Sequence, residues 1–278
     1  MKIAAVIPVR NRPELLRKAI FSVQAQTLPL DELIIVDDAL TDHTAEVARS
    51  MAADDRRIRV IVQPERKMVG AARNVGWRSS GADWIAFLDS DDEWLPEKTE
   101  RQMALLAKSE AVACFTGLKC KVDHYVHSPP ETVSLFDLQR RNVLDTASTS
   151  IVRNSALAAV GGFDKHLPTC VDWDMWIKLR MLGELSILGD PMIYYDRGGG
   201  DRMSRNLENV LKGHQMMLSR TLSDVHGIIR RSRVRAHHHA RMAQILHDNF
   251  ESPIQALSVG APGPGGSPST REQPKRTG

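Results

Sequence analysis

The 278-residue chain lacks several features that would assign it to a common class. Its three cysteines, Cys114, Cys120 and Cys170, show no spacing typical of a metal site or a disulfide framework, which favours a reducing cytoplasm. No apolar stretch reaches membrane-spanning length, and the charged, strand-like start does not resemble a signal peptide. A formal net charge of +3 is too small to indicate nucleic acid as the main partner. We therefore expect a cytoplasmic protein.

Glycine is missing from the segment after the first predicted strand, where several nucleotide-binding folds require it. Residues 8–13 read PVRNRP, whereas a dinucleotide-binding Rossmann fold carries G-x-G-x-x-G at this place. Sugar-1-phosphate nucleotidyltransferases need a glycine-rich loop here as well. The G-x-x-x-x-G-K-[ST] motif of P-loop nucleotidases is also absent. The sequence therefore argues against these three classes.

Apolar runs of strand length alternate with helical patterns through the first 90 residues. Strands are predicted at 3–9, 33–36, 58–62 and before Asp89, with helices starting near Pro13, Thr41 and Val69. This alternation is typical of βαβ units, which build a parallel sheet covered by helices. The sequence therefore predicts an α/β fold with a Rossmann-like, mostly parallel sheet and helices on both faces.

Three polar clusters follow the predicted strands at their carboxyl ends. They are residues 8–11, Asp37-Asp38, and residues 89–91. Because ligands of parallel α/β sheets bind beyond the carboxyl ends of the strands, we expect these clusters to converge on one site.

The third cluster and the residue after it carry three carboxylates within four positions, at Asp89, Asp91 and Asp92. Holding several like charges at a strand end is costly unless a cation binds there, and oxygen ligands suit Mg²⁺ or Mn²⁺. The alternative is that Asp92 or Ser90 caps the helix after Pro96.

The order of the motifs resembles family 2 glycosyltransferases of the GT-A fold over roughly residues 1 to 210. The segments that carry the resemblance are VIPVRN at 6–11, IVDD at 35–38, GAARNVG at 70–76, FLDSDD at 87–92, DWDMW at 172–176 and GGDRMS at 199–204. The resemblance implies a transferase that moves a sugar from a nucleotide-sugar donor to a hydroxyl of a glycan or lipid-linked acceptor.

The resemblance also implies roles for individual residues. Asp38 would bind the nucleobase, Asp89 the ribose, and Asp91 a Mn²⁺ or Mg²⁺ ion that bridges the diphosphate. Asp172 would be the catalytic base of an inverting transfer, and a uracil or thymine base is expected. The expected nucleotide-sugar-binding residues are Pro8, Val9, Arg10, Asp38, Arg73, Asp89, Ser90 and Arg202.

Several alternatives remain at this point. Val171 stands where the family usually has Glu, so a catalytically inactive nucleotide-sugar- or glycan-binding protein of the same fold is the rival hypothesis. Asp172 could instead be a helix N-cap, with Asp174 as the second candidate base. Arg73 could be a solvated helix arginine. Trp173 and the nearby Trp176 are expected in the core rather than against an acceptor sugar.

The domain organisation is expected to fall into four parts. Residues 1–110 form the donor half, 111–222 the acceptor-binding and catalytic half, 223–252 a basic helical extension, and 253–278 a disordered tail. Residues 226–242 hold five arginines and no acid, so this helix either contacts an anionic membrane or is a solvated face. The adjacent histidines 237–239 are expected to be solvated.

Overall fold

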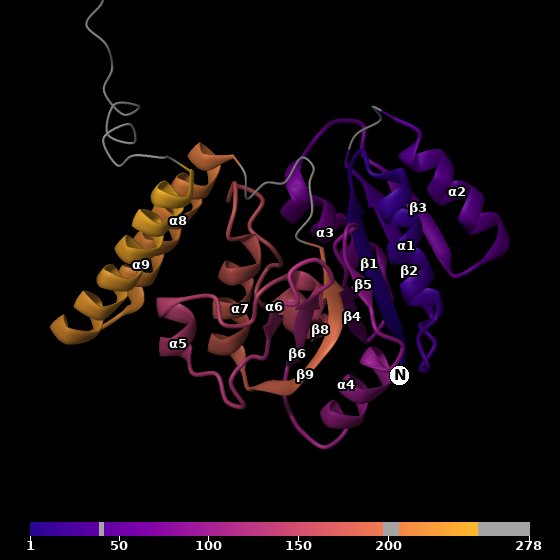
Figure 1. Cartoon of the computed structure of the whole chain (residues 1–278). Helices are drawn as coiled ribbons and strands as arrows, with labels where there is room; N and C mark the ends of the chain where they lie inside the picture. Colours follow the sequence, from indigo (N-terminus) through magenta and orange to yellow (C-terminus); the bar gives the residue numbers. More distant parts are fainter. Residues whose placement is uncertain (39–41, 197–205, 250–278) are drawn as a thin grey trace, which may run out of the picture.

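The computed structural model describes residues 1–38, 42–196 and 206–249 (Figure 1). The strands are β1 (Ile3–Val9), β2 (Glu32–Asp37), β3 (Ile58–Val62), β4 (Trp84–Phe87), β5 (Glu93–Trp94), β6 (Ala113–Cys120), β7 (Val126–His127), β8 (Ser150–Arg153) and β9 (Leu185–Tyr195). The α-helices are α1 (Pro13–Gln24), α2 (Thr44–Asp54), α3 (Met68–Ser79), α4 (Lys98–Leu106), α5 (Leu135–Arg140), α6 (Asn154–Ala159), α7 (Val171–Leu182), α8 (Leu207–Asp224) and α9 (Ile228–Asn249). A short 3₁₀ helix, η1, spans Ala147–Thr149.

One sheet with the strand order β3-β2-β1-β4-β8-β6-β9-β5 runs through the molecule, and β7 pairs with β6. The pairs β3–β2, β2–β1 and β1–β4 are parallel, as the alternating pattern predicted. β8 lies antiparallel between β4 and β6. The chain between β6 and β8 holds a hairpin strand, the short α5 and the 3₁₀ helix η1 instead of the long helical crossover that parallel pairing requires. The predicted α/β class is confirmed, and parallel pairing continues in the second half between β6 and β9.

Helices cover both faces of the sheet, as predicted (Figure 1). Successive residues of β1 point to opposite faces: Ala4 and Val6 enter one apolar cluster, while Ala5 and Ile7 enter the other. The first cluster includes side chains of α3, α6 and α7, and the second those of α1, α2 and α4. A strand buried on both faces explains why β1 is apolar along its whole length.

Helix α3 is joined to the loop before α7 by the buried side chain of Asn74. Its amide donates to the Phe163 carbonyl at 2.7 Å, and its oxygen accepts from the Phe163 backbone N–H at 2.9 Å. Gly162 has φ of +79°, and a Cβ there would lie 2.4 Å from the Asn74 oxygen. A larger residue at this position would therefore be strained and would separate the two segments.

Helix α9 lies in the segment 223–252 that was predicted to be a helical extension, and it packs against α8, which precedes it (Figure 1). His238 of α9 is buried and stacks on Trp173, with ring centroids 4.9 Å apart. The expectation that all three histidines are solvated is thus wrong for His238, because it faces α7 rather than water. None of the helices in the described part of the chain combines the length and apolar character needed to cross a membrane. The predicted tail, 253–278, lies outside the described residues.

Lys98, the first residue of α4, is fully buried. Its ammonium donates to Gln102 Oε1 at 2.8 Å and lies 4.3 Å from the centre of the Trp94 ring. Burial lowers the Lys98 pKa to about 7, because removing the charge from water disfavours the protonated form. The unfolded chain, in which this lysine has an ordinary pKa, binds more protons between these two values.

We therefore predict that the free energy of unfolding of the wild type rises with pH, because the unfolded chain holds the Lys98 proton more tightly than the folded protein does. Between pH 7 and pH 9 it should rise by about 2 kcal/mol more than that of Lys98→Met. Chemical denaturation at several pH values measures this difference. Lys108→Met, an exposed lysine just after α4, is the control and should follow the wild type. Parallel curves for wild type and Lys98→Met would contradict the assigned pKa.

Candidate active site

The carboxyl ends of β1, β2 and β4 lie side by side, which brings the three polar clusters to one edge of the sheet. Val9 of β1 is paired with Asp37 of β2, and the Asp38 backbone N–H donates to the Val9 carbonyl at 2.8 Å. The Leu88 backbone N–H donates to the Val6 carbonyl at 3.1 Å, which sets Asp89 beside the end of β1. The convergence expected from the sequence is therefore present.

Asp38 is buried and held in one orientation at this edge. Its Oδ1 accepts hydrogen bonds from Gln63 Nε2 at 2.8 Å and from the Lys67 backbone N–H at 2.7 Å. Pro8 and Val9 end β1 next to it, and the half-buried Arg10 follows. Gln63 was not predicted as a site residue, although it follows the end of β3 as the acids follow β2 and β4.

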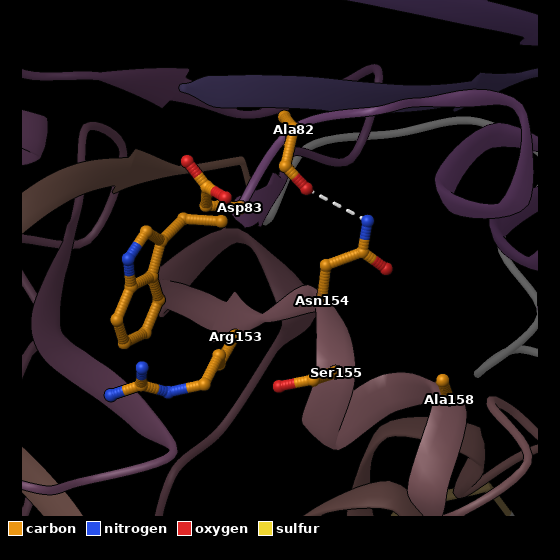
Figure 2. A pocket seen from close by; sticks show the side chains of 7 residues that line it. Ala82, Asp83, Arg153, Asn154, Ser155 and Ala158 are labelled. Carbon is orange, nitrogen blue, oxygen red and sulfur yellow. Dashed lines mark hydrogen bonds between the residues drawn. The ribbon is translucent and has the colours of Figure 1, made fainter. Parts of the chain in front are cut away.

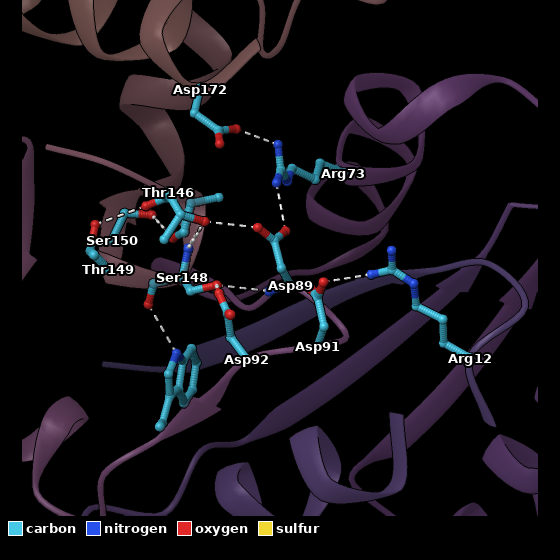
Figure 3. A network of polar contacts seen from close by, with 12 residues as sticks. Arg12, Arg73, Asp89, Asp91, Asp92, Thr146, Ser148, Thr149, Ser150 and Asp172 are labelled. Carbon is cyan, nitrogen blue, oxygen red and sulfur yellow. Dashed lines mark hydrogen bonds and ion pairs between the residues drawn. The ribbon is translucent and has the colours of Figure 1, made fainter. Parts of the chain in front are cut away.

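Arg73 connects two of the carboxylates (Figure 3). Its Nη2 donates to Asp89 Oδ1 at 2.6 Å, and its Nη1 donates to Asp172 Oδ1. The guanidinium lies 5.2 Å from the centre of the Phe163 ring, and the side chain is only 3% exposed. The alternative of a solvated helix arginine is therefore wrong, because the residue lies on the buried side of α3.

Asp89 receives further hydrogen bonds from the segment around η1. Thr146 Oγ1 donates to Asp89 Oδ2 at 2.8 Å, and the Asp89 backbone N–H donates to Ser148 Oγ at 3.0 Å. Burial alone would raise the Asp89 pKa, but the charge and hydrogen bond of Arg73 and the bond from Thr146 bring it below its ordinary value. Thr146 and Ser148 were not predicted, because the polarity of the run TASTS at 146–150 was the only signal in the sequence.

Asp91 lies on the other side of the same turn and pairs with Arg12. Arg12 Nη1 is 2.7 Å from Asp91 Oδ2, and the two side chains are 23% and 16% exposed. In the described parts of the chain, no three histidine, cysteine, aspartate or glutamate side chains group as a metal site.

Asp92 has a structural position behind the turn. Ser148 Oγ donates to its Oδ2 at 2.5 Å, and the Asp196 backbone N–H donates to its Oδ1 at 3.1 Å. Burial, together with the charges of Asp89 and Asp91, raises the Asp92 pKa well above its ordinary value. The alternative that Asp92 or Ser90 caps the next helix is wrong, since α4 begins at Lys98 and both residues are buried in the turn.

Asp172 is the second residue of α7, so it is not the N-cap; Cys170 occupies that position with φ of +61°. The Asp172 side chain is 22% exposed. Burial raises the Asp172 pKa to about 6, although the charge of Arg73 acts in the opposite direction. Val171 is buried in the apolar cluster under α3 and supplies no polar group.

The other polar and aromatic residues of this segment have structural contacts. Asp174 is paired with Lys178 at 2.6 Å and with Arg220 of α8 at 2.9 Å, and its side chain is 7% exposed. Trp176 is fully buried, and Trp173 donates from Nε1 to the Leu138 carbonyl at 2.5 Å. Both tryptophans lie in the core, as expected.

Arg202, the remaining predicted donor residue, lies within 197–205, outside the described residues. A surface hollow of about 390 Å³ lies beside the start of β4, at the edge of the sheet opposite to the carboxylates (Figure 2). There Arg153 stacks on Trp84 at 4.7 Å, and Asn154 donates to the Ala82 carbonyl at 2.8 Å. This hollow does not belong to the candidate active site.

The fold and the carboxylates at its edge define an α/β protein of the GT-A class. Residues 4–160 match the family model described as glycosyl transferase family 2. An uncharacterized glycosyltransferase of Nostoc sp. (strain PCC 7120) is 37% identical over 224 residues, covering 73% of this chain and 67% of that protein. The chain belongs to glycosyl transferase family 2.

One curated relative has a more specific name. TuaG of Bacillus subtilis (strain 168), named for teichuronic acid biosynthesis, is 28% identical over 157 residues, covering 54% of this chain. The matched part is 62% of the length of TuaG, so the chain spans less than two thirds of that relative.

Solved structures share the fold. S. aureus TarS (residues 1–349) in complex with UDP-GlcNAc gives a TM-score of 0.67 at 19% identity, covering 94% of this chain and 76% of that one. The mannosyltransferase PcManGT from Pyrobaculum calidifontis, in complex with GDP-Man and Mn²⁺, gives 0.65 at 16% identity, covering 93% and 78%.

We predict that Arg73→Gln lowers the free energy of unfolding at pH 7 by about 2–3 kcal/mol, since it leaves two partly buried carboxylates without their shared counter-charge. Urea denaturation measures the loss. It should shrink toward pH 5, where Asp172 takes up a proton. Arg78→Gln, an exposed arginine on the same helix, is the control and should cost much less. Equal losses for both variants would refute a special role of Arg73 in the fold.

Proposed function

We propose that this chain transfers a sugar from a UDP- or dTDP-linked donor to a hydroxyl of a glycan or lipid-linked acceptor. The observation that carries the proposal is the Arg73 bridge, which joins the turn of the donor half to Asp172 of the catalytic half. The UDP-GlcNAc complex of a structural relative supports a nucleotide-sugar donor. We infer a cytoplasmic location, because nucleotide sugars are cytoplasmic.

The donor is proposed to bind along the carboxyl edge of the sheet. Asp38 would accept from the nucleobase beside the backbone of Pro8 and Val9, and Asp89 would accept from the ribose hydroxyls. Both carboxylates are already oriented by hydrogen bonds, so little side-chain entropy would be lost on binding. Arg10, Arg73, Ser90 and Arg202 complete the proposed donor set.

Asp91 is proposed to hold a Mn²⁺ or Mg²⁺ ion. Its carboxylate is a hard oxygen donor, it remains partly accessible, and it lies at the edge where the diphosphate would lie, so the donor set fits such an ion. When bound, the ion would stabilise negative charge on the departing nucleoside diphosphate. Arg12, which pairs with the same carboxylate, supplies positive charge at this place in the protein itself.

Asp172 is proposed to take the proton of the acceptor hydroxyl as this oxygen attacks the anomeric carbon. The bond from that carbon to the diphosphate oxygen breaks from the opposite side, so the transfer inverts configuration. A carboxylate base contributes ~10²–10⁴-fold to such a step. Arg73 restricts Asp172 to one orientation and, by its charge, favours the ionised form that can accept a proton.

Nucleotide binding gives the first prediction of this function. UDP or dTDP with Mn²⁺ should raise the melting temperature, since a ligand at a hundred times its Kd stabilises a fold by ~2.7 kcal/mol. Thermal unfolding with UDP, dTDP, GDP and CDP, with and without Mn²⁺, measures it. Asp91→Ala should lose the metal-dependent part of the shift. If none of the four nucleotides changes the melting temperature, the proposed donor site is contradicted.

Replacement of the base separates transfer from binding. Asp172→Asn should lower turnover by ~10²–10⁴-fold while keeping the nucleotide-dependent thermal shift. Asp174→Asn is the matched control: it should lower stability by breaking the pairs to Lys178 and Arg220 but keep turnover. The rival hypothesis of an inactive nucleotide-sugar- or glycan-binding protein, suggested by Val171, expects the wild type to bind donor without turnover.

The pH dependence of kcat/KM should reflect the same carboxylate. Because the base acts when ionised and its pKa is about 6, kcat/KM should fall about tenfold per pH unit below pH 6 and level off above it. Initial rates from pH 4.5 to 8 measure this fall in kcat/KM, and circular dichroism shows whether the protein stays folded over the same range. A profile that stays flat across pH 6 would remove Asp172 from the role of base.

A further inference from the structure

Helix α9 packs against the rest of the protein through one narrow face. Val234, His238 and Ile245 are buried, and they recur at the spacing of one helix face. Most of the remaining side chains between 228 and 247 are exposed. The helix therefore lies on the outside of the catalytic half with one broad face uncovered (Figure 1).

The uncovered side of α9 concentrates positive charge. Five exposed arginines and no acid occur between 226 and 247, which gives this segment a formal charge of +5, whereas the whole chain carries +3. The arginines are Arg230, Arg231, Arg233, Arg235 and Arg241. With Asp248 counted, α9 as a whole has a formal charge of +4, which still exceeds the +3 of the whole chain. The helix therefore complements an anionic partner.

Two large apolar side chains stand among these arginines. Ile228 is 85% exposed and Ile229 is 71% exposed. Arg233 follows Ile229 by four residues, and Arg235 follows Ile228 by seven, so each isoleucine shares a face of the helix with an arginine. Exposed isoleucines would gain from an apolar environment, whereas arginines on the same faces favour negative charge.

We propose that the uncovered face of α9 docks on an anionic lipid surface. Arginines would contact the headgroups, and Ile228 and Ile229 would enter the boundary between headgroups and acyl chains. A lipid surface offers negative charge and an apolar layer together, which a nucleic acid backbone does not. The interaction does not depend on the proposed transferase activity, because it needs neither nucleotide nor turnover.

Vesicle co-sedimentation of the full chain tests this docking. The wild type should bind vesicles of phosphatidylcholine with 30% phosphatidylglycerol, bind pure phosphatidylcholine far more weakly, and dissociate as salt is raised. The triple variant Arg231→Glu, Arg233→Glu, Arg235→Glu should weaken binding by about a hundredfold or more, since each basic residue near an anionic surface contributes roughly fivefold. Arg230 is left unchanged because its guanidinium lies 5.5 Å from the Phe136 ring.

The control is an equal charge reversal on the far side of the sheet. Lys18→Glu, Arg49→Glu and Arg56→Glu, exposed residues on or next to α1 and α2, should leave vesicle binding within about threefold of the wild type. Equal losses in both triple variants would mean that only net charge matters and would overturn the assignment of α9. Circular dichroism and thermal unfolding establish that each variant is folded.

The isoleucines distinguish a lipid surface from other polyanions. Ile228→Ser with Ile229→Ser should lower vesicle affinity by about tenfold or more and leave binding more sensitive to salt. Unchanged affinity in this variant, or tighter binding to a 20-base-pair DNA duplex than to the acidic vesicles, would overturn the lipid proposal. Failure of vesicle binding would leave the nucleotide-dependent thermal shift and turnover unaffected, so the two proposals fail separately.

Discussion

The Arg73 ion-pair bridge is the interaction on which the candidate site depends. A guanidinium that is almost fully buried must have carboxylate partners, and here it has two, one from each half of the molecule. Asp89 belongs to the turn after β4, whereas Asp172 belongs to the first turn of α7. The bridge therefore fixes the distance and orientation between the proposed donor site and the proposed base, and it balances charges that would otherwise repel.

Much of the surrounding structure holds this bridge in place. Asn74, next to Arg73, ties α3 to the backbone of Phe163, and the Phe163 ring covers the guanidinium. On the other side, Ser148 accepts from the Asp89 backbone and donates to Asp92, which in turn accepts from the backbone after β9. The polar network thus connects segments 16 to 104 residues apart in sequence. A displacement of any one of these segments would therefore change the positions of the carboxylates.

The sequence was most informative where local patterns decide the structure. Strands at 3–9 and 58–62 have the predicted bounds. An apolar run of that length between helical patterns is too short for a helix of its own and suits a buried strand. The convergence of Asp38 and Asp89 followed from the geometry of parallel strands alone. The antiparallel β8 was not predicted, because short segments with little periodicity do not specify their pairing partner. The burial of His238 was missed for a related reason, since it depends on Trp173 of a distant helix.

By itself the sequence determined the α/β class and the edge of the sheet that carries the acids, because spacing and residue type are local properties. The candidate base Asp172 and the candidate metal ligand Asp91 came from the resemblance to family 2 glycosyltransferases. Only the tertiary structure decided which acids act together. It paired Asp172 with Arg73 and Asp174 with Arg220, although the two acids are two residues apart, because successive positions on a helix point in different directions. The tertiary structure also distinguished Asp91 from Asp92, because it buries Asp92 and leaves Asp91 partly accessible. This difference in environment cannot be read from the sequence of the two neighbouring acids.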